Sequence, residues 1–579
     1  MLKRIVAFCL LLVCVFGAVS CYNTPPVQQP PNESSGNSGN VNQTPGENEE
    51  NKEPALDNKD DNKDEEKEEP IIPTEILLSE FGDTDFKVVL PKRYKGTMVE
   101  DAALDFVNNF YEKTGAEIEL VSDDAPKSAS EILIGLAPTI ASINATSGLE
   151  KRDYRIKTVS GKILITGGSL YSICLALEDF YNHIQTKTGC YTMSYEYDYT
   201  YTYSKDNSES VYGTLDEKRA QYANPLGRPM VAAHRSEHVY STENSIAGII
   251  SATELGVDII EIDLQKTKDG HYILCHDTTL TSSTNVSELA GKNGLPESHA
   301  VSDWTLEQIM QLTLKGSILG ERPVLLEDVF KIVKGKTIVV LDKIKSDEDA
   351  IAVYEIAVKM RAVDSIAFQF TNSFAALEKA YEETGIPIMY MHWQNTIESA
   401  ADFVTSGRYV ERAYALQAIQ TTVNETTVDK SLTDVVRTKC RIYANTLWTT
   451  GLSSDTPKTW NTLYESGVTI IQTDDPFAVV ALARYLTFGI KYEITYTESP
   501  VLKGTVATIT IDTSVEGGYF FGIEEGKESN RKYSQPIVVK ESSVIRLIRV
   551  INDGKDRITI SFKVLVYSPE YYEMIGISA

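Results

Sequence analysis

Cysteine is scarce in this sequence, which argues against a fold held together by disulfides. Only 7 of its 579 residues are cysteine. Once an N-terminal export signal is removed, five remain: Cys21, Cys174, Cys190, Cys275 and Cys440. The last four are too scattered in so long a chain to form a disulfide framework. Cys174 and Cys190 are close enough in sequence to pair, but we expect no disulfide between them.

Basic residues are also under-represented. Lysine and arginine total 55 against 82 aspartate and glutamate, for a formal net charge of −27. A polyanionic partner would be repelled, so we predict no nucleic-acid binding. The length exceeds what one hydrophobic core supports and predicts three or four domains.

Long apolar runs are missing except near the start. Ile5–Val19 is apolar and follows Lys3 and Arg4, but it is shorter than the roughly 20 residues that span a bilayer. We predict a signal peptide over residues 1–21. Its end, Ala18-Val-Ser-Cys21, resembles a bacterial lipoprotein signal, in which the cysteine is lipidated; a plain secretory signal is the alternative. The resemblance implies an extracytoplasmic protein that a lipid anchors to the cell membrane at the bacterial surface.

Residues 22–73 are rich in Asn, Pro, Gln, Ser, Gly and charged residues, with an excess of acids between Glu47 and Glu69. Such a segment buries too little apolar area to offset its chain entropy. We predict a disordered acidic tether.

Residues 74–212 predict a small α+β domain. Apolar residues recur at helical spacing from Leu104 to Tyr111, strand-like runs follow, and Leu170–Tyr181 is helical in pattern. The order of elements resembles the small domain that precedes the catalytic barrel in several glycoside hydrolases. That resemblance implies a carbohydrate-associated module with possible surface glycan contact, but we favour a packing or spacer role.

Residues 228–487 alternate strand and helix, which predicts a central TIM (β/α)8 barrel. An extra strand, His271–Cys275, is expected in the loop after the second barrel strand. The eight predicted barrel strands are Met230–Ala233, Asp258–Asp263, Thr337–Asp342, Ser365–Phe370, Pro387–Met391, Tyr414–Gln417, Arg441–Asn445 and Val468–Thr473.

Residues 488–579 switch to alternating apolar and polar residues, as in Ile490–Tyr496 and Val506–Ile511. This period predicts a β-sandwich of immunoglobulin-like type. We expect it to bind a surface polymer or to pack on the barrel.

Charged and imidazole side chains gather at the ends of the predicted barrel strands. Glu261 and Asp263 are two residues apart, so they point to the same face and suit a hard divalent cation such as Ca²⁺ or Mg²⁺. His234 and His276 can move protons near neutral pH. The guanidinium of Arg235 matches two phosphate oxygens.

These residues stand in an order that resembles the glycerophosphodiester phosphodiesterase family. The resemblance implies that His234 and His276 share acid and base catalysis, that Arg235 binds phosphate in the reaction, and that Glu261 and Asp263 hold the metal. It covers roughly residues 228–487 and rests on five elements: His234-Arg235, Thr242-Glu-Asn-Ser245, Glu261-Ile-Asp263, Thr267-Lys-Asp-Gly270 through His276-Asp277, and Gly467–Pro476.

The third metal ligand departs from the family pattern. The family has Glu-x-Lys on the third strand, whereas this sequence has Leu341-Asp342-Lys343. Neighbours on a regular strand face opposite ways, so Asp342 and Lys343 can both reach the site only through a bulge or a twist at the strand end. We predict Asp342 as the third ligand and Lys343 as a phosphate contact. The alternatives are another group or water in the metal shell, and Lys345 in place of Lys343.

Three more residues are predicted to bind substrate: Glu243, Gln369 and Trp448. Glu243 is expected to orient a histidine or to lie near the metal, with a helix cap as the alternative. Tyr443 and Asn445 also end a strand, where Tyr443 suits core packing equally well. The other histidines, at 183, 238, 271, 299 and 392, lack such sequence context and are expected on the surface or in structural roles.

The sequence therefore predicts a metal-dependent phosphoric diester hydrolase that releases an alcohol and sn-glycerol 3-phosphate from glycerophosphodiesters or related lipid or wall-polymer diesters. One alternative is a lyase-type phospholipase that stops at a cyclic phosphate. Another is a non-catalytic surface protein with a degenerate barrel that binds glycan or teichoic polymer.

Overall fold

The computed structural model describes residues 74–203, 211–369, 374–386, 389–393, 404, 413–417, 430–523 and 530–577. The predicted lipoprotein signal and acidic tether lie outside the described residues and stay predictions. Within these residues no helix combines the length and the apolar character needed to cross a membrane. The four described cysteines, Cys174, Cys190, Cys275 and Cys440, are all free, as expected.

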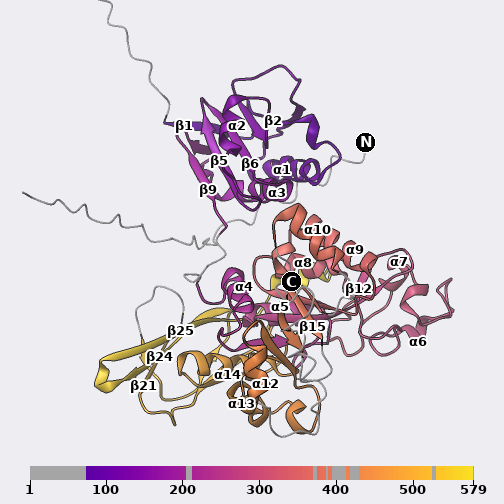
Figure 1. Cartoon of the computed structure of the whole chain (residues 1–579), viewed down its shortest axis with the longest axis vertical. Helices are drawn as coiled ribbons and strands as arrows, with labels where there is room; N and C mark the ends of the chain where they lie inside the picture. The colour runs from indigo at the N-terminus through magenta and orange to yellow at the C-terminus, as the bar shows by residue number, and fades with distance from the viewer. Residues whose placement is uncertain are drawn as a thin grey trace, which may run out of the picture. The chain divides into compact units, whose positions relative to one another are not determined.

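The first described part is built on a mixed sheet (Figure 1). In the order β3-β2-β4-β6-β5-β9, the first four strands run parallel and β5 pairs antiparallel with β6 and β9. A smaller antiparallel sheet has the order β1-β8-β7. The strands are β1 (Glu75–Glu80), β2 (Lys87–Leu90), β3 (Glu119–Ser122), β4 (Glu131–Ile134), β5 (Tyr154–Val159), β6 (Lys162–Gly167), β7 (Gln185–Lys187), β8 (Cys190–Ser194) and β9 (Asp198–Tyr201).

Helices α1 (Met98–Thr114) and α3 (Leu170–Asp179) share one apolar core with this sheet, and α2 (Ile140–Thr146) packs in a second, smaller cluster. Gly115 ends α1 with φ 75°, a left-handed conformation that glycine adopts without steric cost. The two segments with a helical pattern, Leu104–Tyr111 and Leu170–Tyr181, thus lie largely within α1 and α3.

Eight parallel strands close into a barrel, which confirms the TIM-barrel prediction. Closure is made where β10 pairs with both β11 and β18. The barrel strands are β10 (Met230–Ala233), β11 (Ile259–Lys266), β13 (Ile338–Asp342), β14 (Ile366–Gln369), β15 (Met389–Trp393), β16 (Ala413–Gln417), β17 (Arg441–Asn445) and β18 (Ile470–Thr473). Observed and predicted bounds differ by at most a few residues.

Helices follow the strands and cover them with apolar side chains. Outward-facing strand residues such as Ile260, Ile262 and Leu341 join one large core with these helices. The helices of this part are α4 (Leu215–Ala223), α5 (Ile246–Leu255), α6 (Val286–Leu289), α7 (Leu306–Ile309), α8 (Leu326–Val333), α9 (Asp347–Lys359), α10 (Ala375–Thr384), α12 (Lys430–Val436), α13 (Pro457–Glu465) and α14 (Pro476–Phe488).

The barrel interior is apolar at the strand starts. Met230, Ala232, Ile259 and Val340 pack there with Tyr222 of α4 and the inward residues of the other strands. Because side chains alternate along a strand, the next inward positions lie at the carboxyl ends of the strands. The inward-facing polar residues therefore lie together at the carboxyl-terminal mouth of the barrel, above the packed interior.

An excursion after β11 carries the predicted extra strand. β12 (Tyr272–Leu274) pairs antiparallel with the end of β11, and the residues that follow form their own apolar cluster around buried Trp304. This packing fixes the segment that contains His276.

Two antiparallel sheets follow the barrel and share one apolar core. Their orders are β19-β20-β23 and β22-β21-β24-β25; Figure 1 shows β21, β24 and β25 in yellow. The immunoglobulin-like assignment stays a prediction. The elements are β19 (Tyr492–Tyr496), β20 (Ala507–Ile511), β21 (Gly518–Ile523), β22 (Arg531–Lys532), β23 (Ile537–Val539), β24 (Ser543–Ile551), β25 (Asp556–Val564) and the helix α15 (Pro569–Met574).

A buried ion network ties α4 to the bottom of the barrel. Arg228 donates to both oxygens of Glu217 at 2.8 Å and to Asp258 at 2.6 Å. Asp258 also accepts the main-chain N–H of Val231 at 2.9 Å. Burial raises the pKa of Asp258, but Arg228 outweighs burial and leaves that pKa below its ordinary value. The carboxylate is therefore charged and paired in the fold.

We predict that Asp258→Asn lowers the free energy of unfolding by about 3 kcal/mol, because it leaves Arg228 buried with one partner fewer. Urea denaturation measures the difference. The lowered pKa means that the ionised aspartate stabilises the fold above its unfolded pKa, so the difference from the parent protein should shrink as the solution becomes acidic. Asp328→Asn, which removes a partner of the exposed Lys331, is the matched control and should cost under about 1 kcal/mol. Equal losses for both variants would contradict the prediction.

Candidate functional site

A cavity of about 470 Å³ opens at the carboxyl ends of the barrel strands. Its lining is formed mostly by side chains that end or directly follow a barrel strand. The lining residues are His234, Arg235, Glu261, Asp263, His276, Asp342, Lys343, Gln369, Gln417, Asn445, Leu447, Trp448, Gln472 and Asp474. Nine of the ten predicted site residues are therefore brought together; Glu243 lies just outside this lining.

Three carboxylates cluster on neighbouring strands. Asp263 of β11 pairs in register with Asp342 of β13, and Glu261 lies two residues earlier on the same face. Their carboxylate oxygens lie within 4.8 Å of one another. Parallel register thus places three like charges side by side, two of them buried.

This donor set fits a hard divalent cation. Burial, together with Asp263 and Asp342 nearby, raises the pKa of Glu261 well above its ordinary value. Glu261 accepts hydrogen bonds from the main-chain N–H of Arg235 at 3.2 Å and from the amide of Gln472 at 3.1 Å, both neutral donors. Burial also raises the pKa of Asp263, although Arg235 opposes the change. A cation would relieve the repulsion, and carboxylate oxygens are the ligands that Ca²⁺ and Mg²⁺ prefer.

The chain turns sharply after Asp342, and this turn places both Asp342 and Lys343 at the cavity. Lys343 has φ 67°, an uncommon conformation for a residue with a side chain. Its main-chain N–H donates to Asp342 at 2.6 Å, and its Nζ lies 3.3 Å from Asp342 and 3.9 Å from Asp263. Of the two possibilities that the sequence left open, a bulge or a twist at the strand end, the structure contains the twist.

Arg235 follows β10 in a strained conformation as well, with φ 48°. Its Nε lies 3.3 Å from Asp263, and its Nη1 donates to Glu243 at 2.9 Å. Glu243 therefore contacts the arginine rather than a histidine. Its assignment as a substrate-binding residue stays a prediction.

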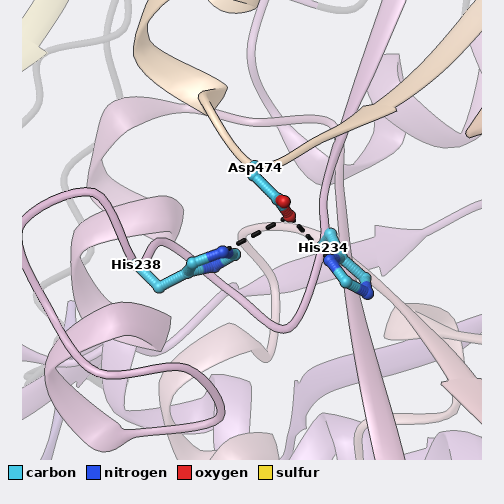
Figure 2. A group of neighbouring side chains, drawn as sticks. All are labelled: His234, His238 and Asp474. Atoms are coloured by element: carbon cyan, nitrogen blue, oxygen red, sulfur yellow. Dashed lines mark hydrogen bonds and ion pairs between the residues drawn. The ribbon is translucent and has the colours of Figure 1, made fainter. Parts of the chain in front are cut away.

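Two histidines contact the same aspartate (Figure 2). Nδ1 of His234 lies 2.7 Å from Oδ1 of Asp474, and Nε2 of His238 lies 3.3 Å from the same oxygen. Burial raises the pKa of Asp474, but hydrogen bonds from His234 and His238 outweigh it and hold this pKa far below its ordinary value. An ionised Asp474 that accepts from Nδ1 leaves Nε2 of His234 as the nitrogen that can exchange a proton.

His276 reaches the same cavity from the β12 excursion. The main-chain N–H of Cys275 donates to the carbonyl of Asp263 at 3.0 Å, which holds this turn over the barrel mouth. Nδ1 of His276 lies 2.8 Å from Asp277, whose other oxygen accepts from Ser282 at 2.6 Å. Each cavity histidine thus has one nitrogen held by a carboxylate.

The structure adds residues to which the sequence assigned no role. Gln417, Gln472 and Asp474 line the cavity, and His238 lies beside Asp474. Gln417 pairs with the predicted Gln369, whose amide donates to it at 2.9 Å. The sequence could have indicated Gln417 and Gln472, because they lie in predicted strands and inward-facing positions recur at every second residue of a strand. No such period applies to His238, which lies in a loop.

The family model of the glycerophosphoryl diester phosphodiesterase family matches residues 234–477. The resemblance inferred from the motifs is confirmed for this segment. The matched segment begins at His234 and extends past Asp474, so it contains every residue of the cavity described above.

Curated relatives agree over shorter stretches. A glycerophosphodiester phosphodiesterase of Caldanaerobacter subterraneus is 37% identical over 123 residues, which is 21% of this chain and 46% of that protein. One from Bacillus subtilis is 41% identical over 58 residues, which is 10% of this chain and 20% of that protein. The chain thus matches less than half the length of these relatives.

Two solved structures are similar to part of this chain. A glycerophosphoryl diester phosphodiesterase from Parabacteroides distasonis is 22% identical and covers 47% of this chain and 92% of its own, with a TM-score of 0.36. An Oleispira antarctica phosphodiesterase, solved with the product sn-glycerol-3-phosphate, is 18% identical and covers 43% and 94%, with a TM-score of 0.33.

We predict that Asp342→Asn weakens Mg²⁺ or Ca²⁺ binding about tenfold or more, because it removes a charged oxygen from the cluster. Isothermal titration calorimetry measures the affinity. Ion binding should also release protons, since a cation lowers the raised pKa of Glu261; affinity should therefore rise with pH. Asp347→Asn, an exposed aspartate at the start of α9, is the control. Unchanged affinity in Asp342→Asn would exclude Asp342 as a ligand.

Proposed function

We propose that the barrel hydrolyses glycerophosphodiesters to an alcohol and sn-glycerol 3-phosphate. The observation that carries this proposal is the convergence, in one cavity within the matched segment, of two histidines, two cationic side chains and the cluster of Glu261, Asp263 and Asp342. Phosphodiester cleavage needs charge neutralisation at phosphorus together with a base and an acid, and these groups supply both.

Glu261, Asp263 and Asp342 would hold the divalent ion. When bound, such an ion neutralises phosphate charge and orients the diester. Nε of Arg235 lies 3.3 Å from one oxygen of Asp263, and Nζ of Lys343 lies 3.9 Å from the other. Their cationic groups would bind the remaining phosphate oxygens, with the guanidinium offering two parallel donors.

His234 and His276 would divide the proton transfers. One imidazole takes the proton from the attacking hydroxyl group, and the other gives a proton to the departing alkoxide. The partners Asp474 and Asp277 hold Nδ1 of each ring and keep the rings oriented. The nucleophile is either water or a neighbouring hydroxyl of the glycerol, which gives a cyclic phosphate first. Gln369 and Trp448, on the cavity wall, would contact the alcohol portion of the substrate.

We further propose an extracytoplasmic setting. The N-terminal sequence supports a lipid anchor, and the acidic segment after it supports a tether that holds the folded part away from the membrane. Lipid-derived diesters and glycerol-phosphate wall polymers are then accessible substrates. The shared core of the two C-terminal sheets supports an immunoglobulin-like sandwich, which would serve as a spacer or contact a surface glycan.

We predict that His234→Ala and His276→Ala each lower kcat on glycerophosphocholine about 100-fold or more, because each removes one proton transfer. A substrate with a nitrophenolate leaving group needs no acid. The variant that lacks the general acid should therefore recover much of its rate on that substrate, whereas the variant that lacks the base should not. Steady-state kinetics on both substrates gives the assignment.

His271→Ala removes an exposed imidazole from the same excursion and is the matched control. Full turnover in His234→Ala and His276→Ala would refute the histidine assignment. Phosphorus NMR of the products tests the reaction type, since accumulation of cyclic phosphate would indicate a lyase. An absence of turnover with Mg²⁺ and with Ca²⁺ would favour a binding protein.

A further inference from the structure

The group formed by His234, His238 and Asp474 has a geometry of its own, beside the three carboxylates. One ligand atom from each of its three residues lies within 4.8 Å of the others. Figure 2 shows both rings turned toward the carboxylate, which comes from the loop after β18. We call this group the His–His–Asp cluster.

The spacing of the cluster approaches the edges of a tetrahedral site. A metal with bonds of about 2.0–2.1 Å to nitrogen and oxygen sets its ligand atoms about 3.3 Å apart. The two nitrogen-to-oxygen distances on Asp474 are 2.7 Å for His234 and 3.3 Å for His238. The His238 distance already equals this spacing, and the His234 distance would lengthen by about 0.6 Å to admit an ion, with a fourth position left for water.

The chemistry of the cluster differs from that of the carboxylate site. Imidazole nitrogen suits Zn²⁺, Co²⁺ and related transition ions, whereas carboxylate oxygen alone suits Mg²⁺ and Ca²⁺. The side chains are also reachable from solvent, at 15% exposure for His234, 22% for His238 and 43% for Asp474. Transition ions should therefore prefer the His–His–Asp cluster, whereas Mg²⁺ and Ca²⁺ should prefer the three carboxylates.

The loop that carries His238 is held in place. Ser236 has φ 71°, and the buried carboxylate of Glu237 accepts from the main-chain N–H of Tyr240 at 2.7 Å and from Ser241 at 2.9 Å. Gly248 of α5 packs so closely that an added methyl group would collide with the carbonyl of Glu237. The main chain that carries the second imidazole is thus fixed before any ion arrives, which lowers the entropic cost of binding.

We propose that the His–His–Asp cluster is a second metal site, selective for an imidazole-preferring divalent ion such as Zn²⁺ and separate from the three carboxylates. Binding uses the lone pairs on Nδ1 of His234 and on Nε2 of His238. The proton that each of these nitrogens donated to Asp474 then moves through solvent to the other nitrogen of the same ring, so neither ring loses a proton. A ring with metal on Nδ1 and hydrogen on Nε2 can neither accept a proton nor become imidazolium, and the ion therefore inhibits the proposed hydrolysis.

The binding test uses Co²⁺ with the whole protein, in excess Mg²⁺ to fill the carboxylate site. Four-coordinate Co²⁺ with imidazole ligands has intense visible absorption bands, whereas six-coordinate Co²⁺ among oxygen ligands is pale. We expect intense bands in the parent protein. His238→Gln and Asp474→Asn should weaken Co²⁺ and Zn²⁺ binding about tenfold or more and remove the bands.

His271→Gln removes an exposed imidazole outside the cluster and should bind as the parent does. Near-ultraviolet circular dichroism checks that each variant is folded. The proposal is overturned if both cluster variants bind Co²⁺ as tightly as the parent, or if only Asp342→Asn abolishes binding, since the ion then lies among the carboxylates.

Zinc inhibition gives a second readout that also depends on the proposed hydrolase activity. In excess Mg²⁺, micromolar Zn²⁺ should inhibit the parent reversibly, and His238→Gln should need about tenfold more Zn²⁺ relative to its own zinc-free rate. Undiminished zinc sensitivity in His238→Gln would contradict the inhibitory role. Co²⁺ binding is measured without turnover. If the hydrolase proposal is wrong, the Co²⁺ bands remain and hydrolysis is absent; if the metal site is wrong, the bands are absent whether or not the protein hydrolyses the substrate.

Discussion

The repulsion among Glu261, Asp263 and Asp342 is the constraint on which the site depends. Three carboxylates within 4.8 Å of one another, two of them buried, are unfavourable in a low-dielectric interior unless a proton or a cation joins them. The barrel enforces this arrangement, because the register of β11 and β13 leaves Asp263 beside Asp342. The site is therefore built to accept positive charge, and Arg235 and Lys343 supply part of it.

Backbone strain at the strand ends is a second feature on which the geometry of the site depends. Arg235, Ser236 and Lys343 all have positive φ, which residues with side chains rarely adopt. Such conformations persist where the surrounding packing determines them, and here they bring a guanidinium and an ammonium group back over the carboxylates. A regular strand would have pointed Lys343 away from Asp342.

Much of the barrel was predictable because buried parallel strands are short apolar runs separated by helices. Met230–Ala233 and Arg441–Asn445 match their predicted bounds, and Pro387 and Phe370 lie outside the described residues. The motifs and the predicted strand ends together identified nine residues of the cavity. Asp474 and His238 gained no role from the sequence. Asp474 lies 240 residues from His234 along the chain, and His238 lies in the loop after His234, where no period indicates which way a side chain points.

The sequence by itself determined the order of strands and helices, the alternation that sends Glu261 and Asp263 to one face, and the family of residues 234–477. Only the tertiary structure decided that Asp342 and Lys343 share the cavity, that Glu243 contacts Arg235, and that His234 and His238 meet on Asp474. The physical reason is that periodicity is a local property of the chain. Contacts across a closed barrel depend on inter-strand register and on loop conformations that no local pattern specifies.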